Sequence, residues 1–65
     1  MYQVWSTYSN GRPNSLMYEG TLDECRKEAR RLREKFPRNN YVVVKEGGVV
    51  ADREGYLIFR SGYIV

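Results

Sequence analysis

The stretch at residues 21–37, TLDECRKEARRLREKFP, constrains the fold of this chain more than any other part of the sequence. Thr21 is followed three residues later by Glu24, which is a capping-box pattern. In this pattern each side chain accepts a hydrogen bond from the backbone N–H of the other residue. Pro37 disfavours helical geometry at the residue before it, so it ends the segment. The stretch therefore predicts one α-helix with both ends defined.

The apolar residues of this segment follow helical spacing. They are Leu22, Cys25, Ala29, Leu32 and Phe36. Intervals of three and four residues place them in one narrow stripe along a helix. We expect this stripe to face the core, with Cys25 acting as an inert packing residue.

The remainder of the chain has the alternation and turn residues of short strands. The predicted strands are residues 2–8, 16–19, 41–46, 49–51 and 56–60, with 63–65 as a last strand or a tail. Residues 9–15 form a loop, and Gly47-Gly48 predicts a hairpin turn. The three consecutive valines at 42–44 indicate a strand that is covered on both faces, so we place it centrally.

The predicted fold is α+β in ββαβββ order, a single compact domain over residues 1–65. Its single helix packs on one face of an antiparallel sheet of four or five strands. The residues expected under the helix are Val42, Val44, Leu57 and Phe59. The residues expected on the far face are Tyr41, Val43, Lys45, Tyr56, Ile58 and Arg60. One helix leaves this second face uncovered, and a contiguous apolar patch usually marks an interface.

Composition excludes several classes of function. The 65 residues include one cysteine and no histidine, so an intrachain disulfide and an imidazole base are both impossible. A lone cysteine without histidine does not supply the ligands of a zinc site. We therefore expect no catalytic residue, metal or cofactor. No apolar run approaches the ~20 residues of a membrane span, and no signal peptide is evident. The expected location is cytoplasmic.

The formal net charge of +3 favours anionic partners. At 100° per residue, Arg26, Arg30 and Arg33 fall on one flank of the helix beside the apolar stripe. One interpretation is a solvated surface whose arginine stems cover the rim of the core. The ion pairs that would accompany this interpretation are Asp23–Lys27 and Arg30–Glu34. The other interpretation is an anion-binding edge, because guanidinium groups match phosphate and carboxylate oxygens in two-point contacts.

A second set of candidate ligand-binding residues lies on the far face of the predicted sheet. It comprises Tyr41, Lys45, Tyr56 and Arg60. Tyrosines between cations on a sheet can stack and hold single-stranded nucleic acid. The same face can instead pack against another copy of the chain. The predicted oligomer interface is Tyr41, Val43, Tyr56, Ile58, Tyr63 and Ile64.

These observations predict a small non-enzymatic binding or inhibitor-type accessory protein, of the size often encoded by phages and mobile elements. It is expected to form a homodimer, because a thin core without disulfide or metal is commonly completed by self-association. It would act by occupying a protein partner or an anionic ligand. The alternative is a nucleic-acid or nucleotide-binding module that uses the arginine flank and the tyrosines. A structural subunit of a larger assembly is a third interpretation.

Overall fold

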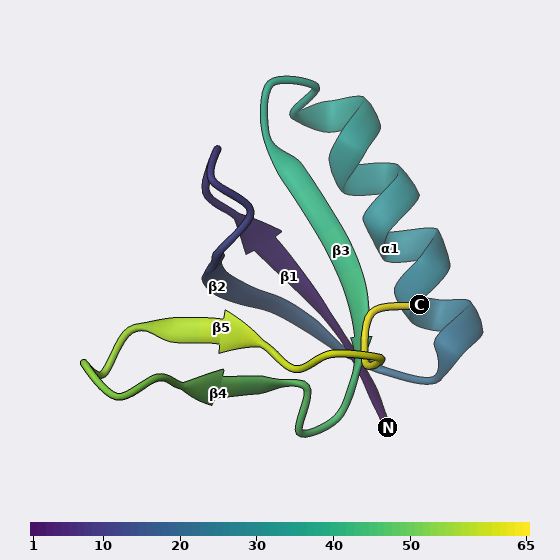
Figure 1. The fold of residues 1–65 in the computed structure, drawn as a ribbon. Coiled ribbons are helices and arrows are strands. Elements are labelled where there is room, and N and C mark those ends of the chain that lie inside the picture. The colour runs from purple at the N-terminus through teal and green to yellow at the C-terminus, as the bar shows by residue number, and fades with distance from the viewer.

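The computed structural model describes the whole chain, Met1–Val65, as one helix and five strands (Figure 1). In chain order these are β1 (Tyr2–Thr7), β2 (Pro13–Gly20), α1 (Leu22–Lys35), β3 (Asn40–Lys45), β4 (Val49–Ala51) and β5 (Leu57–Phe59). Every strand pairing is antiparallel. The predicted α+β class and the ββαβββ order are confirmed.

Helix α1 begins and ends where the local sequence predicts. The Thr21 hydroxyl accepts a hydrogen bond from the Glu24 N–H at 3.2 Å, and a Glu24 carboxylate oxygen accepts one from the Thr21 N–H at 2.9 Å. At the other end, the Phe36 N–H donates to the Leu32 carbonyl at 2.8 Å. Phe36 is the C-cap, with φ −128° and ψ 72°, and Pro37 follows it. The capping box and the proline therefore set both ends of α1.

The main sheet has three strands in the order β2-β1-β3, so β1 is central. The predicted central position of β3 is therefore wrong. On the side away from β1, β3 has only one bridge, between Val44 and Ile64. Two backbone bonds flank this bridge: the Lys45 N–H donates to the Tyr63 carbonyl, and the Val65 N–H donates to the Val43 carbonyl, both at 2.9 Å. The C-terminal segment therefore lies along the outer edge of β3 without forming a full strand.

Strand β2 is longer than predicted because it begins at Pro13, inside the expected loop. It pairs only with β1, and the pairing contains two register shifts. Proline is tolerated at the first residue of an edge strand, where the missing N–H breaks no ladder. The irregular pairing and the proline also make this free edge a poor template for another strand.

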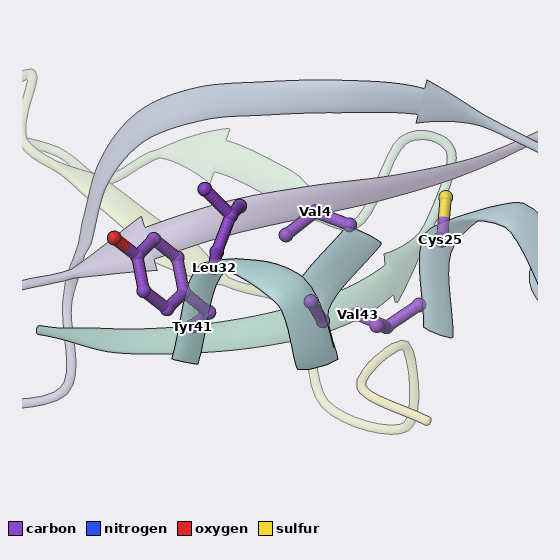
Figure 2. Packing of buried hydrophobic residues seen from close by; sticks show 6 residues of the cluster. Val4, Cys25, Leu32, Tyr41 and Val43 are labelled. Atoms are coloured by element: carbon purple, nitrogen blue, oxygen red, sulfur yellow. The ribbon is translucent and has the colours of Figure 1, made fainter. Parts of the chain in front are cut away.

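The register between β1 and β3 decides which face the helix covers. Val4 is paired with Val43, so both side chains point to the same side of the sheet. The core cluster on that side is Val4, Cys25, Ala29, Leu32, Tyr41 and Val43 (Figure 2). The predicted position of Tyr41 and Val43 on the far face is therefore wrong. Alternation shows that neighbouring residues point to opposite faces, but it does not say which face the helix covers.

The β4–β5 hairpin forms a separate two-stranded sheet on the side of the main sheet opposite α1, where Figure 2 shows it behind the strands. The expectation that Leu57 and Phe59 lie under the helix is therefore wrong. Val44 points to this second side and is fully buried. The second side of the sheet is thus partly covered within the chain, and the structure has three layers: helix, sheet and hairpin.

The turn after β3 directs the chain out of the main sheet and does not return it as a neighbouring strand. The Gly48 N–H donates to the Lys45 carbonyl at 2.9 Å, which closes the turn. A Cβ atom on Gly48 would approach the Lys45 carbonyl oxygen and the Tyr63 Cβ to 2.8 Å each. Only glycine fits where this turn passes against the C-terminal segment. The close approach fixes the segment that forms one wall of the candidate site.

Candidate anion-binding groove

The three arginines predicted on one flank of α1 line a single groove. It has a volume of about 390 Å³ and lies between α1, β3 and the C-terminal segment. The lining residues are Arg26, Ala29, Arg30, Arg33, Val42, Val43, Ile64 and Val65. The groove thus combines a row of guanidinium groups with an apolar floor and far wall.

The geometry of α1 places these arginines. The capping box fixes where the helix starts, and the apolar stripe fixes which side of it faces the sheet. Ala29, which lies between Arg26 and Arg33 in the sequence, is fully buried on the side of α1 that faces the sheet. Residues at intervals of four and three share one flank, so the three side chains follow one another along the edge of the buried stripe.

None of the three arginines has a carboxylate partner within the chain. The ion pairs of the structure are Met1–Glu46, Arg12–Asp52 and Arg31–Glu28. Neither predicted helix pair, Asp23–Lys27 nor Arg30–Glu34, forms. The side chains of Arg26 and Arg30 also make no hydrogen bond to any protein group. The donors of these two side chains are therefore directed to solvent or to a ligand.

Arg33 is held more firmly than its two neighbours. Its Nη2 donates a hydrogen bond to the Tyr41 carbonyl oxygen at 3.0 Å, so the side chain spans from α1 to β3. A guanidinium group has five N–H donors in a planar fork, and this contact uses one of them. Arg33 therefore fixes the helix to the strand and still presents donors at the groove.

The opposite flank of α1 differs in electrostatic character, because it carries carboxylates that pair with neighbouring groups, although Lys27 has no ion pair there. Arg31 is paired with Glu28, and this contact raises the pKa of Arg31. The Tyr18 hydroxyl donates to a Glu24 oxygen at 3.3 Å, and the negative charge of Glu24 raises the pKa of Tyr18. Hydrogen bonds from Thr21 lower the pKa of Glu24. The arginine groove is thus the flank of α1 where three cations follow one another without a carboxylate partner.

The other predicted ligand-binding residues do not join this groove. Tyr41 is 5% exposed and lies beneath α1. Lys45 is exposed at the end of β3, and Tyr56 is exposed near the tip of the β4–β5 hairpin. The Arg60 guanidinium stacks on the Tyr63 ring at 4.9 Å. The predicted face of tyrosines between cations is therefore wrong, because it assumed that β3 and β5 lie in one sheet.

The predicted oligomer interface is dispersed in the same way. Tyr41 and Val43 are buried within the chain, so the surface of one molecule does not offer them to another. Ile58 and Tyr63 are half-buried. Tyr56 and Ile64 are at least half exposed, but Tyr56 is near the tip of the hairpin and Ile64 is at the edge of β3. The sequence therefore did not define one continuous interface.

A cluster between the tips of the two hairpins brings together residues that the sequence does not predict to meet. Arg12 lies 3.7 Å from Asp52 through Nη1 and Oδ2, and its guanidinium carbon lies 5.8 Å from the centre of the Tyr56 ring. These residues belong to turns that are at least 40 residues apart along the chain. The turn sequences were recognised, but no local signal shows that the two turns meet.

Cys25 is fully buried, and burial raises the pKa of its thiol. Its predicted position in the core stripe is confirmed. No group of three or more histidine, cysteine, aspartate or glutamate side chains is arranged to hold a metal ion. A raised pKa and complete burial both oppose reactivity in a thiol.

Comparisons with protein-family models, with curated proteins and with solved structures found no match to this chain. The only helix, α1, has neither the length nor the apolar character needed to cross a membrane. The arrangement of the residues themselves is therefore the basis for the functional proposal.

Proposed function

We propose that this protein is a small non-enzymatic binding protein that holds an anionic ligand in the arginine groove. The observation that carries the proposal is the row formed by Arg26, Arg30 and Arg33. These three cations line one groove, and none has a carboxylate within 4.0 Å. A free phosphate or carboxylate group would supply the missing counter-charge.

The spacing of the three arginines supports a ligand because it is unfavourable without one. Arg26 and Arg30 are four residues apart, and Arg30 and Arg33 are three apart. Like charges at such positions destabilise a helix by roughly 0.2–0.5 kcal/mol per pair. An anion bound between them replaces this repulsion with charge-assisted hydrogen bonds, which are about twice as strong as neutral ones.

The apolar part of the groove defines the ligand further. Ile64 and Val65 line the groove together with the guanidinium groups, and both are about half exposed. A ligand that carries an apolar portion next to its anionic group would cover them. An acidic protein segment with interspersed apolar residues has this chemistry, which agrees with occupancy of a protein partner. A nucleotide or nucleic acid would share the anion contacts, but no tyrosine lines the groove to stack its bases.

The test compares two double variants with the same change in net charge. Arg26→Gln/Arg30→Gln removes the two groove cations whose side chains make no ion pair or hydrogen bond within the chain. Arg38→Gln/Arg53→Gln removes two exposed arginines outside it and serves as the matched control. Arg33 is left intact because its contact with the Tyr41 carbonyl is structural. The probes are a fluorescein-labelled glutamate-leucine peptide and a labelled oligothymidylate, followed by fluorescence anisotropy at increasing salt.

We expect the groove variant to lose affinity for the peptide and to show a weaker salt dependence, while the control stays close to the wild type. For the oligothymidylate, each lost phosphate contact should reduce the salt slope by about 0.7. Equal losses in both variants would attribute binding to net charge alone and would refute the groove. Tighter groove-dependent binding of the oligothymidylate would favour the nucleic-acid alternative over a protein partner.

Self-association stays a prediction. The uncovered sheet face that motivated it is partly covered by the β4–β5 hairpin, so the argument for a homodimer now rests mainly on the thin core. Light scattering over a range of protein concentrations tests it. If a dimer forms through Ile64 and Val65, it will compete with the peptide for the arginine groove.

A further inference from the structure

A second cleft opens between the tips of the two hairpins, away from the arginine groove. It has a volume of about 530 Å³ and shares no lining residue with the groove. Its polar and aromatic walls are formed by Tyr8, Asn10, Arg12 and Asn14 on one side and by Tyr56 on the other. The side chains of Tyr8 and Tyr56 are more than half exposed, at 54% and 60%.

Both walls of this cleft are held in place by their own turns. The Gly11 N–H donates to the Tyr8 carbonyl at 2.9 Å, and the Arg12 N–H donates to Asn10 Oδ1 at 3.0 Å. In the other turn, Asp52 Oδ1 accepts hydrogen bonds from the N–H groups of Glu54 and Tyr56 at 2.8 and 2.9 Å. Each wall is therefore preorganised by its own turn, which reduces the entropy lost when a ligand binds.

Arg12 joins the two walls. Its Nη1 lies 3.7 Å from Asp52 Oδ2, and its guanidinium carbon lies 5.8 Å from the centre of the Tyr56 ring. Asp52 supplies a counter-charge for Arg12, so this cation differs from the unpaired arginines of the groove. The neighbouring Arg53 and Glu54 have opposite charges. A ligand of this cleft therefore needs no net charge.

The hydrogen-bonding groups of the cleft are mostly free donors. Asn10 Oδ1 is occupied by the Arg12 N–H, and Asn14 Oδ1 by the Ser15 hydroxyl at 3.4 Å. The amide NH₂ groups of both asparagines have no partner within the chain, and neither do the hydroxyl groups of Tyr8 and Tyr56. A matching ligand must present acceptors and apolar surface for the rings, and it needs few donors of its own.

We propose that this cleft binds a proline-rich peptide in the polyproline II conformation. Such a segment presents carbonyl acceptors and pyrrolidine rings, and its prolines have no N–H to leave unsatisfied. Its extended conformation is preformed, so it docks into aromatic-lined grooves with a small entropy loss. Tyr8 and Tyr56 provide the ring surfaces, and Asn10 and Asn14 donate to the peptide carbonyls.

The experiment uses decaproline as the probe and a glycine-serine peptide of equal length, which keeps all its N–H groups, as the control peptide. Amide chemical shifts of the full chain are recorded by nuclear magnetic resonance during each titration. We expect decaproline to shift the backbone amide signals of residues 8–12, 14 and 55–57, independently of salt. Nuclear Overhauser contacts between proline protons and the rings of Tyr8 and Tyr56 would locate the peptide without any mutation.

Two variants make the test specific. Tyr56→Ala should weaken decaproline binding about tenfold, the loss expected of an aromatic anchor. Phe36→Ala is the matched control: Phe36 is also an exposed aromatic, with the Lys35 ammonium 5.5 Å from the centre of its ring, but it lies outside the cleft. This control should change affinity less than twofold. Tyr56→Phe separates the ring from the hydroxyl, because it keeps the former and removes the latter.

The proposal is overturned if decaproline at about 1 mM shifts no amide of the two turns, a level that would show binding even of weak ligands. It is also overturned if the glycine-serine peptide shifts the same amides equally. Stronger shifts of these amides with an oligothymidylate would replace the peptide by a nucleic acid. None of these outcomes bears on the arginine groove, since the two sites share no residue and only the groove is expected to respond to salt.

Discussion

Replacing Leu32 by alanine tests the core that positions both walls of the arginine groove. Leu32 is 4% exposed and belongs to the cluster of Val4, Tyr41 and Val43 (Figure 2). Leucine-to-alanine changes in a core cost about 2–5 kcal/mol, and the cost is larger where the surroundings cannot collapse. Tyr41 is restrained by hydrogen bonds from Asn39 to its hydroxyl and from Arg33 to its carbonyl. We therefore expect a loss of about 3 kcal/mol in the free energy of unfolding.

That loss is large for a chain of this size. At roughly 0.05–0.15 kcal/mol per residue, the total free energy of unfolding is on the order of 3–10 kcal/mol. A loss of about 1 kcal/mol lowers the thermal midpoint of a small domain by about 4–8 °C. Leu32→Ala should therefore lower the midpoint by about 12–24 °C or leave the chain largely unfolded. Circular dichroism during heating and during urea titration measures both quantities.

Phe36→Ala is the matched control for this experiment. Phe36 lies in the same apolar stripe of the sequence, but its side chain is 43% exposed because the C-cap departs from helical geometry. Its backbone bond to Leu32 is unaffected by the substitution. We expect a loss below about 1 kcal/mol, well short of the cost of a fully buried aromatic. Equal losses for the two variants, or a negligible loss for Leu32→Ala, would refute the packing described for α1.

Two further predictions follow from α1. The buried Cys25 thiol, whose pKa is raised by burial, should react with a thiol reagent such as Ellman's reagent only after denaturation; rapid labelling of the native protein would place it at the surface. Thr21→Ala should lower the free energy of unfolding by about 1 kcal/mol, because it removes the N-cap hydrogen bond. The folded state lowers the pKa of Glu24, so the wild type should lose stability as the pH falls from the ordinary glutamate pKa of 4.5 through that lowered pKa. Glu24→Gln, which can still accept from the Thr21 N–H, should weaken that acid dependence in urea denaturation at several pH values; an unchanged pH profile would contradict the role of Glu24 as a charged cap.

Predictions from sequence succeeded where the signal was local. The ends of α1 depend on Thr21, Glu24 and Pro37, and each of these residues affects only the backbone within three residues of it in the sequence. The buried positions Cys25, Ala29 and Leu32 follow from helical spacing alone. The arginine flank was found for the same reason, because the helix determines which of its own side chains are neighbours.

Predictions failed where the pairing of distant segments decides the outcome. Residues 42–44 are all valine, so their sequence does not show which of them face the helix. Only the pairing of Val43 with Val4 in β1 decides which face each valine is on. The position of the β4–β5 hairpin depends on the C-terminal segment, which occupies the edge of β3 at Ile64. The prediction places β5 in the same sheet as β3, and it therefore puts Tyr41 and Tyr56 on one face. In the structure the two strands lie in different sheets.

Both candidate sites are formed where such distant segments meet. The arginine groove forms only where Arg26 and Arg30 of α1 lie beside Ile64 of the C-terminal segment. That segment is joined to β3 by a single bridge. The hairpin cleft needs Arg12 beside Tyr56, from turns in two different sheets. Few bonds hold either junction, and sites with such sparse support open more readily than the core. A ligand that contacts both sides of a junction would therefore stabilise the whole chain on binding, so the thermal midpoint should rise with the concentration of peptide at either site.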